Sequence, residues 1–213
     1  MKKLLAKINY LRAGGCNLPV VLVRYLWYRI FFGKRILCHQ GVTIRGVRNI
    51  MMGKDHLEIG LSIRGMSLRS DRTLLNINGE LILNGRVNIA RGCRIDVEGV
   101  LILNHNVSIN YDTRIICSRK IWIGEGTTIS WGVQLLDNDW HTLSYDGYKE
   151  KNPEITIGKR VWIGCLSAIY KGVEIADGCG VAGSAVIKKS HKNPHMLIVS
   201  DDREIPNFKW DEV

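Results

Sequence analysis

An aliphatic residue that returns every six positions dominates the hydrophobic pattern of the chain. In the C-terminal third the recurring residue is isoleucine or valine, at positions 157, 163, 169, 175, 181 and 187. Four positions after each of the first five comes a small or short side chain: Val161, Ser167, Val173, Cys179 and Ala185. A period of six fits neither the 3.6-residue turn of a helix nor the alternation of a long strand. It predicts a parallel β-helix, a triangular solenoid with one short strand for each hexad and face.

Longer coils with the same pattern precede this region. Segments 81–100 ("LILNGRVNIARGCRIDVEGV") and 101–120 ("LILNHNVSINYDTRIICSRK") are twenty residues each, and a weaker copy, "LEIGLSIRG", occupies 57–65. Twenty is two hexads plus eight, so one corner of each coil carries two additional residues. We expect large aliphatic side chains to fill the interior, and glycine or short polar residues to form the corners. The predicted fold class is all-β, a solenoid preceded by a short helical segment.

The first 35 residues follow a helical pattern instead. The leucine and isoleucine residues of "KKLLAKINYLRA" fall on one helical face, and Gly14-Gly15 ends that helix. Asn17 is expected to cap a second helix, "LPVVLVRYLWYRIFF", with Pro19 in its first turn. The second helix is apolar on almost every side, but Arg24 and Arg29 interrupt it and leave it too short to span a bilayer.

The net charge of +10 is concentrated at this N-terminal end. Eleven basic and no acidic residues precede Asp55, whereas the remaining chain holds 19 basic against 20 acidic side chains. A basic end on a neutral body favours an anionic partner such as lipid headgroups or acidic glycan. Aromatic residues do not interleave with a basic stripe on the repeats, so nucleic acid is not expected. Two compatible interpretations of residues 1–35 stay open: contact with the inner membrane surface, or a packing role as a cap on the open end of the solenoid or against a neighbouring subunit.

The expected organisation is a basic helical segment at 1–38, a β-helix domain at 39–190 and a tail at 191–213. The six cysteines form no CxxC pair and no zinc-like spacing, so no metal is expected. Cys93 and Cys179 fall on the inward small-residue positions of the repeat. We therefore expect the cysteines to be reduced and to serve in packing. The protein is expected to be cytoplasmic, either free or bound at the inner membrane surface.

The hexads stop at Leu135 and resume at Ile155, so a loop of about residues 136–154 leaves the wall. The segment "LLDNDWHTLSYDG" carries one histidine, His141, among carboxylates and aromatics. A loop that projects from a rigid solenoid is where function usually lies. A neutral imidazole can act as a general base, and Asp137 and Asp139 are close enough in sequence to orient its ring.

Two stretches, "VWIGCLSAIYKGVEIADGCGVAGSAVIKK" and "LDNDWHTL", resemble the hexapeptide-repeat acyltransferases. The similarity is greatest to the maltose and galactoside acetyltransferases and to the capsule or O-antigen O-acetyltransferases, and it covers about residues 57–190. It implies a left-handed β-helix, an exception to the usual right-handed crossover, and a homotrimer with active sites between neighbouring prisms. It also implies acetyl-CoA as donor and a sugar hydroxyl of a bacterial surface polysaccharide, or of its lipid-linked precursor, as acceptor.

The resemblance also implies roles for individual residues. His141 takes the position of the catalytic base, with Asp137, Asp139 and Trp140 as orienting or acceptor-binding residues. Asn110, in "INYD", matches an asparagine whose amide would donate to the developing oxyanion. Where the maltose and galactoside enzymes have an aspartate this chain has Ser118, which leaves the acceptor open. No serine or cysteine stands in a nucleophile setting, so direct transfer is favoured over an acyl-enzyme.

The donor groove is expected on the C-terminal hexads. By family position Cys165 would meet the pantetheine arm, backbone groups of 182–184 would pair with its amides, and Lys188 would lie near the nucleotide phosphates. An outward tryptophan beside an inward isoleucine suggests a ligand or subunit contact. The cofactor-binding set is Trp162, Cys165, Ala182, Gly183, Ser184 and Lys188. After Lys189 the family's adenine-contacting turn is replaced by "IVSDDREIPNFKW", which leaves the adenine contacts unassigned.

Three other functions stay open. A β-helix carbonic anhydrase holds zinc on three histidines, and His105 and His141 have a similar spacing, but Asp146 stands at the third position. A repeat scaffold without catalysis would not need His141. A sugar N-acetyltransferase often carries an added nucleotide-fold domain, for which 213 residues leave no room.

Overall fold

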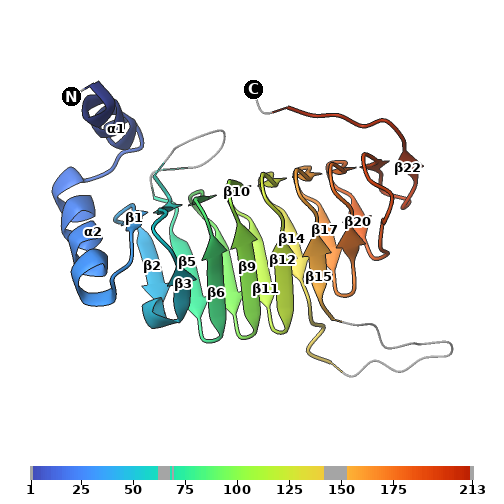
Figure 1. Cartoon of the computed structure of the whole chain (residues 1–213), viewed down its shortest axis with the longest axis horizontal. Coiled ribbons are helices and arrows are strands. Elements are labelled where there is room, and N and C mark those ends of the chain that lie inside the picture. The colour runs from blue at the N-terminus through green and yellow to red at the C-terminus, as the bar shows by residue number, and fades with distance from the viewer. Residues whose placement is uncertain (1, 62–67, 69, 142–152, 212–213) are drawn as a thin grey trace.

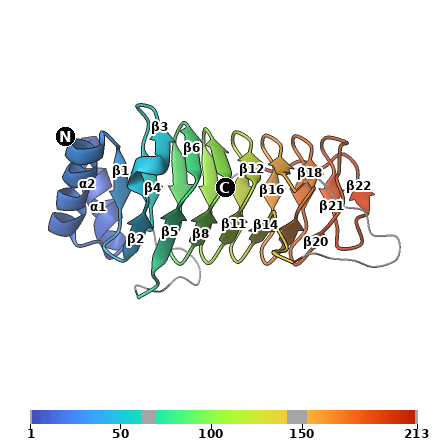
Figure 2. The same ribbon diagram turned by 90° about the horizontal axis from the view of Figure 1, so that it is seen from below.

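The computed structural model describes residues 2–61, 68, 70–141 and 153–211 of the chain. They form a left-handed parallel β-helix of stacked triangular coils, with two helices at its N-terminal end (Figure 1). Each coil contributes one strand to each of three faces, so three sheets run along the solenoid (Figure 2). The predicted fold class is confirmed.

The helices are α1 (Lys2–Ala13) and α2 (Leu18–Phe32), and η1 (Val47–Asn49) is a short 3-10 turn. Sheet A contains β1 (Ile36–Cys38), β4 (Leu57–Ile59), β7 (Val87–Ile89), β10 (Val107–Ile109), β13 (Thr128–Ile129), β16 (Trp162–Ile163), β19 (Gly180–Val181), β21 (Leu197–Ile198) and β22 (Glu204–Ile205). Sheet B contains β2 (Val42–Arg45), β5 (Thr73–Ile77), β8 (Arg94–Val97), β11 (Arg114–Cys117), β14 (Gln134–Leu136), β17 (Ala168–Tyr170) and β20 (Val186–Ile187). Sheet C contains β3 (Ile50–Met52), β6 (Glu80–Asn84), β9 (Val100–Asn104), β12 (Lys120–Ile123), β15 (Ile155–Ile157) and β18 (Glu174–Ile175).

The strand register agrees with both predicted coil lengths. β8 pairs with β11 through Ile95 and Ile115, twenty positions apart, and β15 pairs with β18 through Ile157 and Ile175, eighteen positions apart. The two additional residues of the longer coils belong to sheet B and the corner after it, because β8 and β11 have four residues whereas β17 has three. The pairs described are parallel except β21 with β22. We call the three corners the A–B, B–C and C–A edges.

The interior is filled as the hexad pattern predicts. The six recurring aliphatic residues from 157 to 187 are buried, and so are the five small residues that follow at the fourth position. Cys93 and Cys179 lie in this core, and burial raises the pKa of the Cys93 thiol to about 12. All six cysteines are free thiols. The five buried cysteines are therefore supported as reduced packing residues. Cys165 is only half-buried and is not one of them.

The helical segment caps the first coil of the solenoid. Asn17 accepts a hydrogen bond from the amide of Val20 and begins α2 as predicted, and Tyr28 of α2 packs in the main core. The buried guanidinium of Arg91 donates to the carbonyl oxygens of Gly14 and Gly60, at 2.8 Å each, and so ties the turn between the helices to the wall. Of the two interpretations of residues 1–35, the cap is confirmed.

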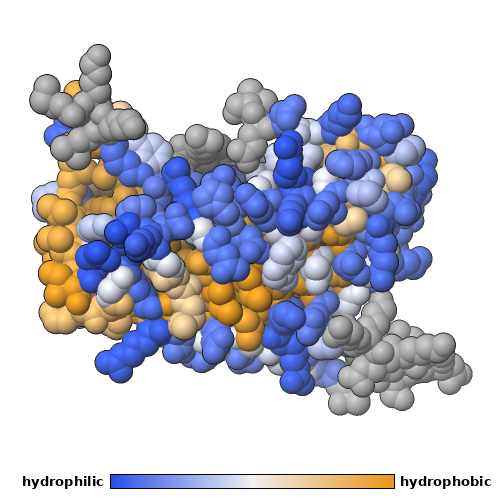
Figure 3. All heavy atoms as spheres, viewed as in Figure 1, coloured by the Kyte–Doolittle hydropathy of each residue, from blue (hydrophilic) through white to orange (hydrophobic). Residues whose placement is uncertain are grey.

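The other half of α2 faces outward and is apolar (Figure 3). Its exposed side chains are Val20, Leu22, Val23, Leu26, Trp27, Ile30 and Phe31. Ile30 is 71% exposed and Phe31 is 65% exposed, so this face has no covering element among the described residues. In the described part of the chain no helix is long and apolar enough to cross a membrane.

The boundaries of the solenoid differ slightly from those expected. The first strand, β1, begins at Ile36, inside the segment 1–38, and β21 continues sheet A beyond residue 190. From β22 the chain returns toward the middle coils (Figures 1 and 2). Phe208 of this tail stacks on Trp162 of sheet A at a ring separation of 6.3 Å.

Candidate functional site

The wall of the solenoid breaks at the B–C edge, and Asp137 closes the break. In the regular coils, the amides of Glu98 and Gly99 bond to the carbonyl oxygen of Cys117 on the next coil, at 2.8 and 3.0 Å. β11 and β14 pair with an offset of twenty residues, so Asp137 stands one coil after Cys117 at the equivalent position. Asp137 is fully buried. Its two carboxylate oxygens accept from the amides of Ser118 and Arg119, at 2.7 and 2.8 Å. The carboxylate therefore replaces a carbonyl group that the interrupted wall does not supply.

The position of Asp137 bears on its predicted role. Both carboxylate oxygens bond to the wall, so the described contacts give Asp137 a structural role at the break; its predicted role in orienting the ring of His141 stays a prediction. The same charge acts on the neighbouring thiol: burial first, and Asp137 second, raise the pKa of Cys117 to about 12.

His141 lies at the end of the described part of this loop and is exposed to solvent. Before it, Asp139 forms an ion pair of 2.8 Å with Lys171 of the next coil. Trp140 is 50% exposed, and its amide donates to the side chain of Asn138 at 3.0 Å. The base of the loop is thus fixed by a buried carboxylate, a partly buried ion pair and a local turn. The other loop residues, Asp146 among them, lie outside the described residues.

Asn110 lies on a different edge of the prism. It follows β10 at the A–B edge, where its side-chain amide donates to the carbonyl oxygen of Ile129 on the next coil at 2.9 Å. One of the two N–H donors of this amide is used within the wall, so oxyanion stabilisation would fall to the other. Sheet B separates Asn110 from His141 in one chain, because His141 follows β14 at the B–C edge.

The predicted pantetheine contacts share the A–B edge with Asn110. Cys165 is half-buried, and Gly183 and Ser184 are exposed, each at the corner after a strand of sheet A. The amides of Ala182 and Ser184 donate to Ile198 and Cys165 within the wall, at 2.8 and 2.7 Å. Gly183 is the exposed backbone position between them.

Two further members of the predicted cofactor-binding set lie elsewhere. The ammonium of Lys188 lies 5.8 Å from the centre of the Tyr170 ring, at the B–C edge near the base of the loop. Trp162 points outward from sheet A as predicted, but Phe208 stacks on it and its ring nitrogen donates to Ser130 at 3.1 Å. The structure therefore brings Cys165 and 182–184 together, and leaves Lys188 across sheet B from them.

An apolar ridge at the A–B edge was missed by sequence reasoning. Tyr111 and Trp131 stack with nearly parallel rings 5.7 Å apart, and Leu166 follows one coil later, 54% exposed. Leu166 has φ of +60°, a conformation that is uncommon for a leucine and marks local strain. The available signal was an aromatic residue at the same corner of two successive coils, twenty positions apart.

The described residues contain no group of three or more histidine, cysteine, aspartate or glutamate side chains that could hold a metal ion. His105 instead accepts a hydrogen bond from the amide of Arg86 at 3.3 Å.

Comparison with known proteins agrees with the geometry. No protein-family model matches the chain. A Klebsiella pneumoniae relative, described as an uncharacterized 24.8 kDa protein in the cps region, is 37% identical over 203 residues, which cover 85% of this chain and 91% of the relative. The polysialic acid O-acetyltransferase OatWY shares the fold with a TM-score of 0.54 and 20% identity, over 81% of this chain and 89% of that one.

Two more distant solved structures have TM-scores of 0.43. They are the polySia-specific acetyltransferase NeuO, 17% identical over 85% of this chain and 79% of that one, and a mutant of AntD. The latter is an N-acyltransferase from Bacillus cereus, in complex with dTDP and coenzyme A, and is 18% identical over 83% of each chain.

The coils and their hexads define a hexapeptide-repeat protein with the left-handed β-helix fold, as the resemblance implied. Within this class, the chain belongs to the family of the Klebsiella pneumoniae cps-region protein.

Proposed function

We propose that the protein is an acetyl-CoA-dependent O-acetyltransferase that modifies a sugar hydroxyl of a bacterial surface polysaccharide or its precursor. The observation that carries the proposal is an exposed histidine, His141, held where the solenoid wall opens by Asp137 and by the Asp139–Lys171 ion pair. The fold shared with OatWY and the relative in the cps region both favour this class of reaction and acceptor.

The proposed reaction requires one general base and no covalent acyl-enzyme intermediate. The imidazole of His141 would take the proton of the sugar hydroxyl as its oxygen attacks the thioester carbonyl. The carbon–sulfur bond then breaks, and the imidazolium returns the proton to the departing thiolate. A positioned base of this kind contributes about 10²- to 10⁴-fold in rate. No cysteine of the buried core competes as a nucleophile, because burial raises the pKa of the Cys38 thiol to about 11.

We further propose that the working form is a homotrimer with active sites between subunits. His141 and Asn110 flank sheet B from opposite edges, so the two meet most directly if His141 reaches the A–B edge of a second copy. The outward column of sheet C offers an apolar surface for such contact: Met51, Ile82, Ile102 and Trp122 follow one another in register. Met51 is exposed and the other three are half-buried, and an apolar row on an outer face of this kind favours an interface.

The proposal is tested by release of free thiol from acetyl-CoA in the presence of a panel of glycans. His141→Ala is expected to lower the rate at least 100-fold, and His56→Ala, an exposed histidine before β4, is the matched control. Co-expression of His141→Ala with Asn110→Ala chains then distinguishes where the site lies. Recovery of activity is expected if the two residues act across subunits. Wild-type rates from His141→Ala would remove the base from its role.

We also propose that the exposed half of α2 rests on an anionic membrane surface. Apolar side chains cover this half, while Arg12 and Arg29 are exposed beside it and no acidic residue precedes Asp55. An apolar helical face with basic flanks binds at the headgroup boundary of anionic lipid. The wild type should float with phosphatidylglycerol-containing vesicles and not with phosphatidylcholine alone. Ile30→Glu should abolish flotation, while Val186→Glu, at an exposed valine of sheet B, should not; equal flotation of both variants would contradict this contact.

A further inference from the structure

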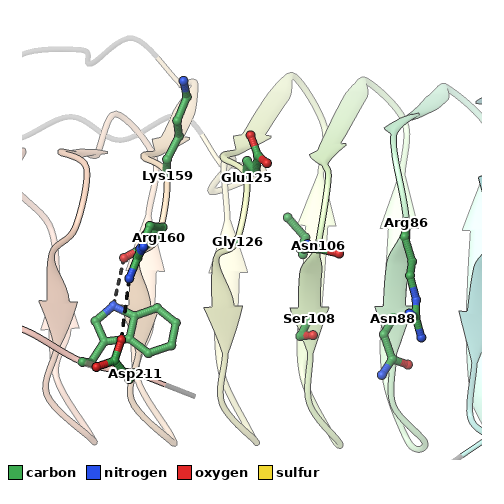
Figure 4. Close-up of a pocket in the computed structure, with 11 residues that line it drawn as sticks. Arg86, Asn88, Asn106, Ser108, Glu125, Gly126, Lys159, Arg160 and Asp211 are labelled. Carbon is green, nitrogen blue, oxygen red and sulfur yellow. Dashed lines mark hydrogen bonds and ion pairs between the residues drawn. The ribbon is translucent and has the colours of Figure 1, made fainter. Parts of the chain in front are cut away.

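A groove of about 580 Å³ runs along the outer surface of sheet A, away from the B–C edge that carries His141. Asn88 of β7 and Ser108 of β10, which are neighbours in the register, lie on its floor. Residues of four successive coils line it in a row at the C–A edge, and the tail closes one end (Figure 4). Four coils span three strand spacings of about 4.8 Å, or about 14 Å, which is longer than one sugar ring.

The side chains of the groove are suited to a ligand rich in hydroxyl groups. Asn88 and Asn106 each offer an amide that donates and accepts, and Ser108 adds a hydroxyl. The outward column of sheet A is polar or aromatic from Glu58 through Asn88, Ser108 and Thr128 to Trp162. The outward column of sheet C is apolar from Met51 to Trp122 and becomes polar only at Thr156, so the two faces differ in character over most of these coils.

An aromatic ring stands at the end of the groove and is held in place. The ring nitrogen of Trp210 donates to the carbonyl oxygen of Arg160 at 2.9 Å, and Asp211 pairs with the Arg160 guanidinium at 3.7 Å. Two residues earlier in the tail, Phe208 stacks on Trp162. An indole fixed in advance costs little entropy when a flat ring packs against it.

Charged side chains of both signs lie along the row. Arg86 pairs with Glu58 at 3.5 Å and Arg160 with Asp211 at 3.7 Å, and the row also holds Lys159 and Glu125. Lys159 forms no ion pair among the described residues. Guanidinium and ammonium groups beside neutral amides favour a ligand that carries a carboxylate as well as hydroxyls.

We propose that this groove binds a segment of an acidic oligosaccharide, with a sugar ring against Trp210 and a carboxylate near Lys159 and Arg160. The choice of a glycan rests on the proposed function, and the groove would then hold a part of the acceptor chain remote from the hydroxyl that is modified. The groove does not include His141. Binding and acetyl transfer therefore fail or succeed separately.

The test is isothermal titration of the full chain with tetragalacturonic acid and with a hyaluronan tetrasaccharide, each beside its methyl ester. The wild type should bind at least one of the acids saturably, and the matching ester at least tenfold more weakly. Trp210→Ala and Arg160→Ala should each weaken binding at least tenfold. The matched control is Arg203→Ala, because Arg203 is 69% exposed with a 3.6 Å ion pair, close to the 73% and 3.7 Å of Arg160.

His141→Ala should bind as the wild type does, even where it no longer releases thiol from acetyl-CoA. The proposal is overturned if neither acid binds, if ester and acid bind equally, or if Trp210→Ala and Arg203→Ala are indistinguishable. Loss of binding in His141→Ala would also overturn it, since the ligand would then lie at the loop and not in the groove. Retained binding with no thiol release by the wild type would instead count against the proposed function alone.

Discussion

Replacing Asp137 is expected to destabilise the solenoid wall at the B–C edge, where the hexads are interrupted. Asp137→Ala removes a fully buried carboxylate and with it the acceptors of two partly buried amides, those of Ser118 and Arg119. A buried donor left without a partner costs about 1–3 kcal/mol, so the pair should cost about 2–6 kcal/mol. This is a large share of a total stability of about 5–15 kcal/mol. Asp137→Asn keeps one acceptor and should cost about half as much.

The assay should read those two amides directly. Hydrogen exchange of the segment from Arg114 to Lys120, followed by mass spectrometry, reports their protection, and equilibrium unfolding in guanidinium reports the whole chain. At the lower limit of about 2 kcal/mol the protection of the two amides should fall roughly 30-fold. Because a solenoid unfolds partly coil by coil, the local measurement is the more informative one.

Asp177→Asn is the matched control, since its carboxylate also accepts from a corner amide, that of Lys159 at 2.7 Å, but at an exposed site. Solvent can replace that bond, so the control should lose less than about 1 kcal/mol. Unchanged exchange at Ser118 and Arg119 in Asp137→Ala, with a loss of stability no larger than in the control, would refute the reasoning.

Two predictions concern the N-terminal cap. Arg91→Met should leave the carbonyl oxygens of Gly14 and Gly60 without their donor, and proteolysis near Gly14 should become at least tenfold faster, whereas Arg114→Met, at an exposed arginine of sheet B, should change nothing. Acidification should loosen the same region, because burial, and then the charges of Arg91 and Arg24, lower the pKa of His39 below its ordinary 6.5. The folded chain keeps His39 neutral while the unfolded chain takes up the proton, so its contribution is present above pH 6.5 and is lost as the pH falls. Exchange protection of the two helices should decrease from pH 7 to pH 5 in the wild type and less in His39→Gln; equal slopes would contradict the assignment.

Some features of the site could be read from the chain, and others could not. The sequence singles out His141 because the loss of hexads at Leu135 marks the point where the wall opens, and Trp162 because an outward tryptophan is conspicuous beside an inward isoleucine. The structural role of Asp137 was not foreseen, because only the register reveals that its carboxylate stands where a backbone carbonyl is missing. The groove on sheet A was not foreseen, because it joins Asn88 to Trp210, residues more than one hundred positions apart.

By itself the sequence determined the solenoid. Its signal is local: each strand is short, each coil repeats the last, and an aliphatic residue every six positions decides which side faces inward. It also determined both helices, their caps and the place of the loop. Only the tertiary structure decided which side chains share an edge, that α2 closes the first coil while leaving its other face bare, and that the tail returns over sheet A. These depend on coil length and on the path of the chain between coils, and no period in the sequence encodes contacts between segments that lie so far apart.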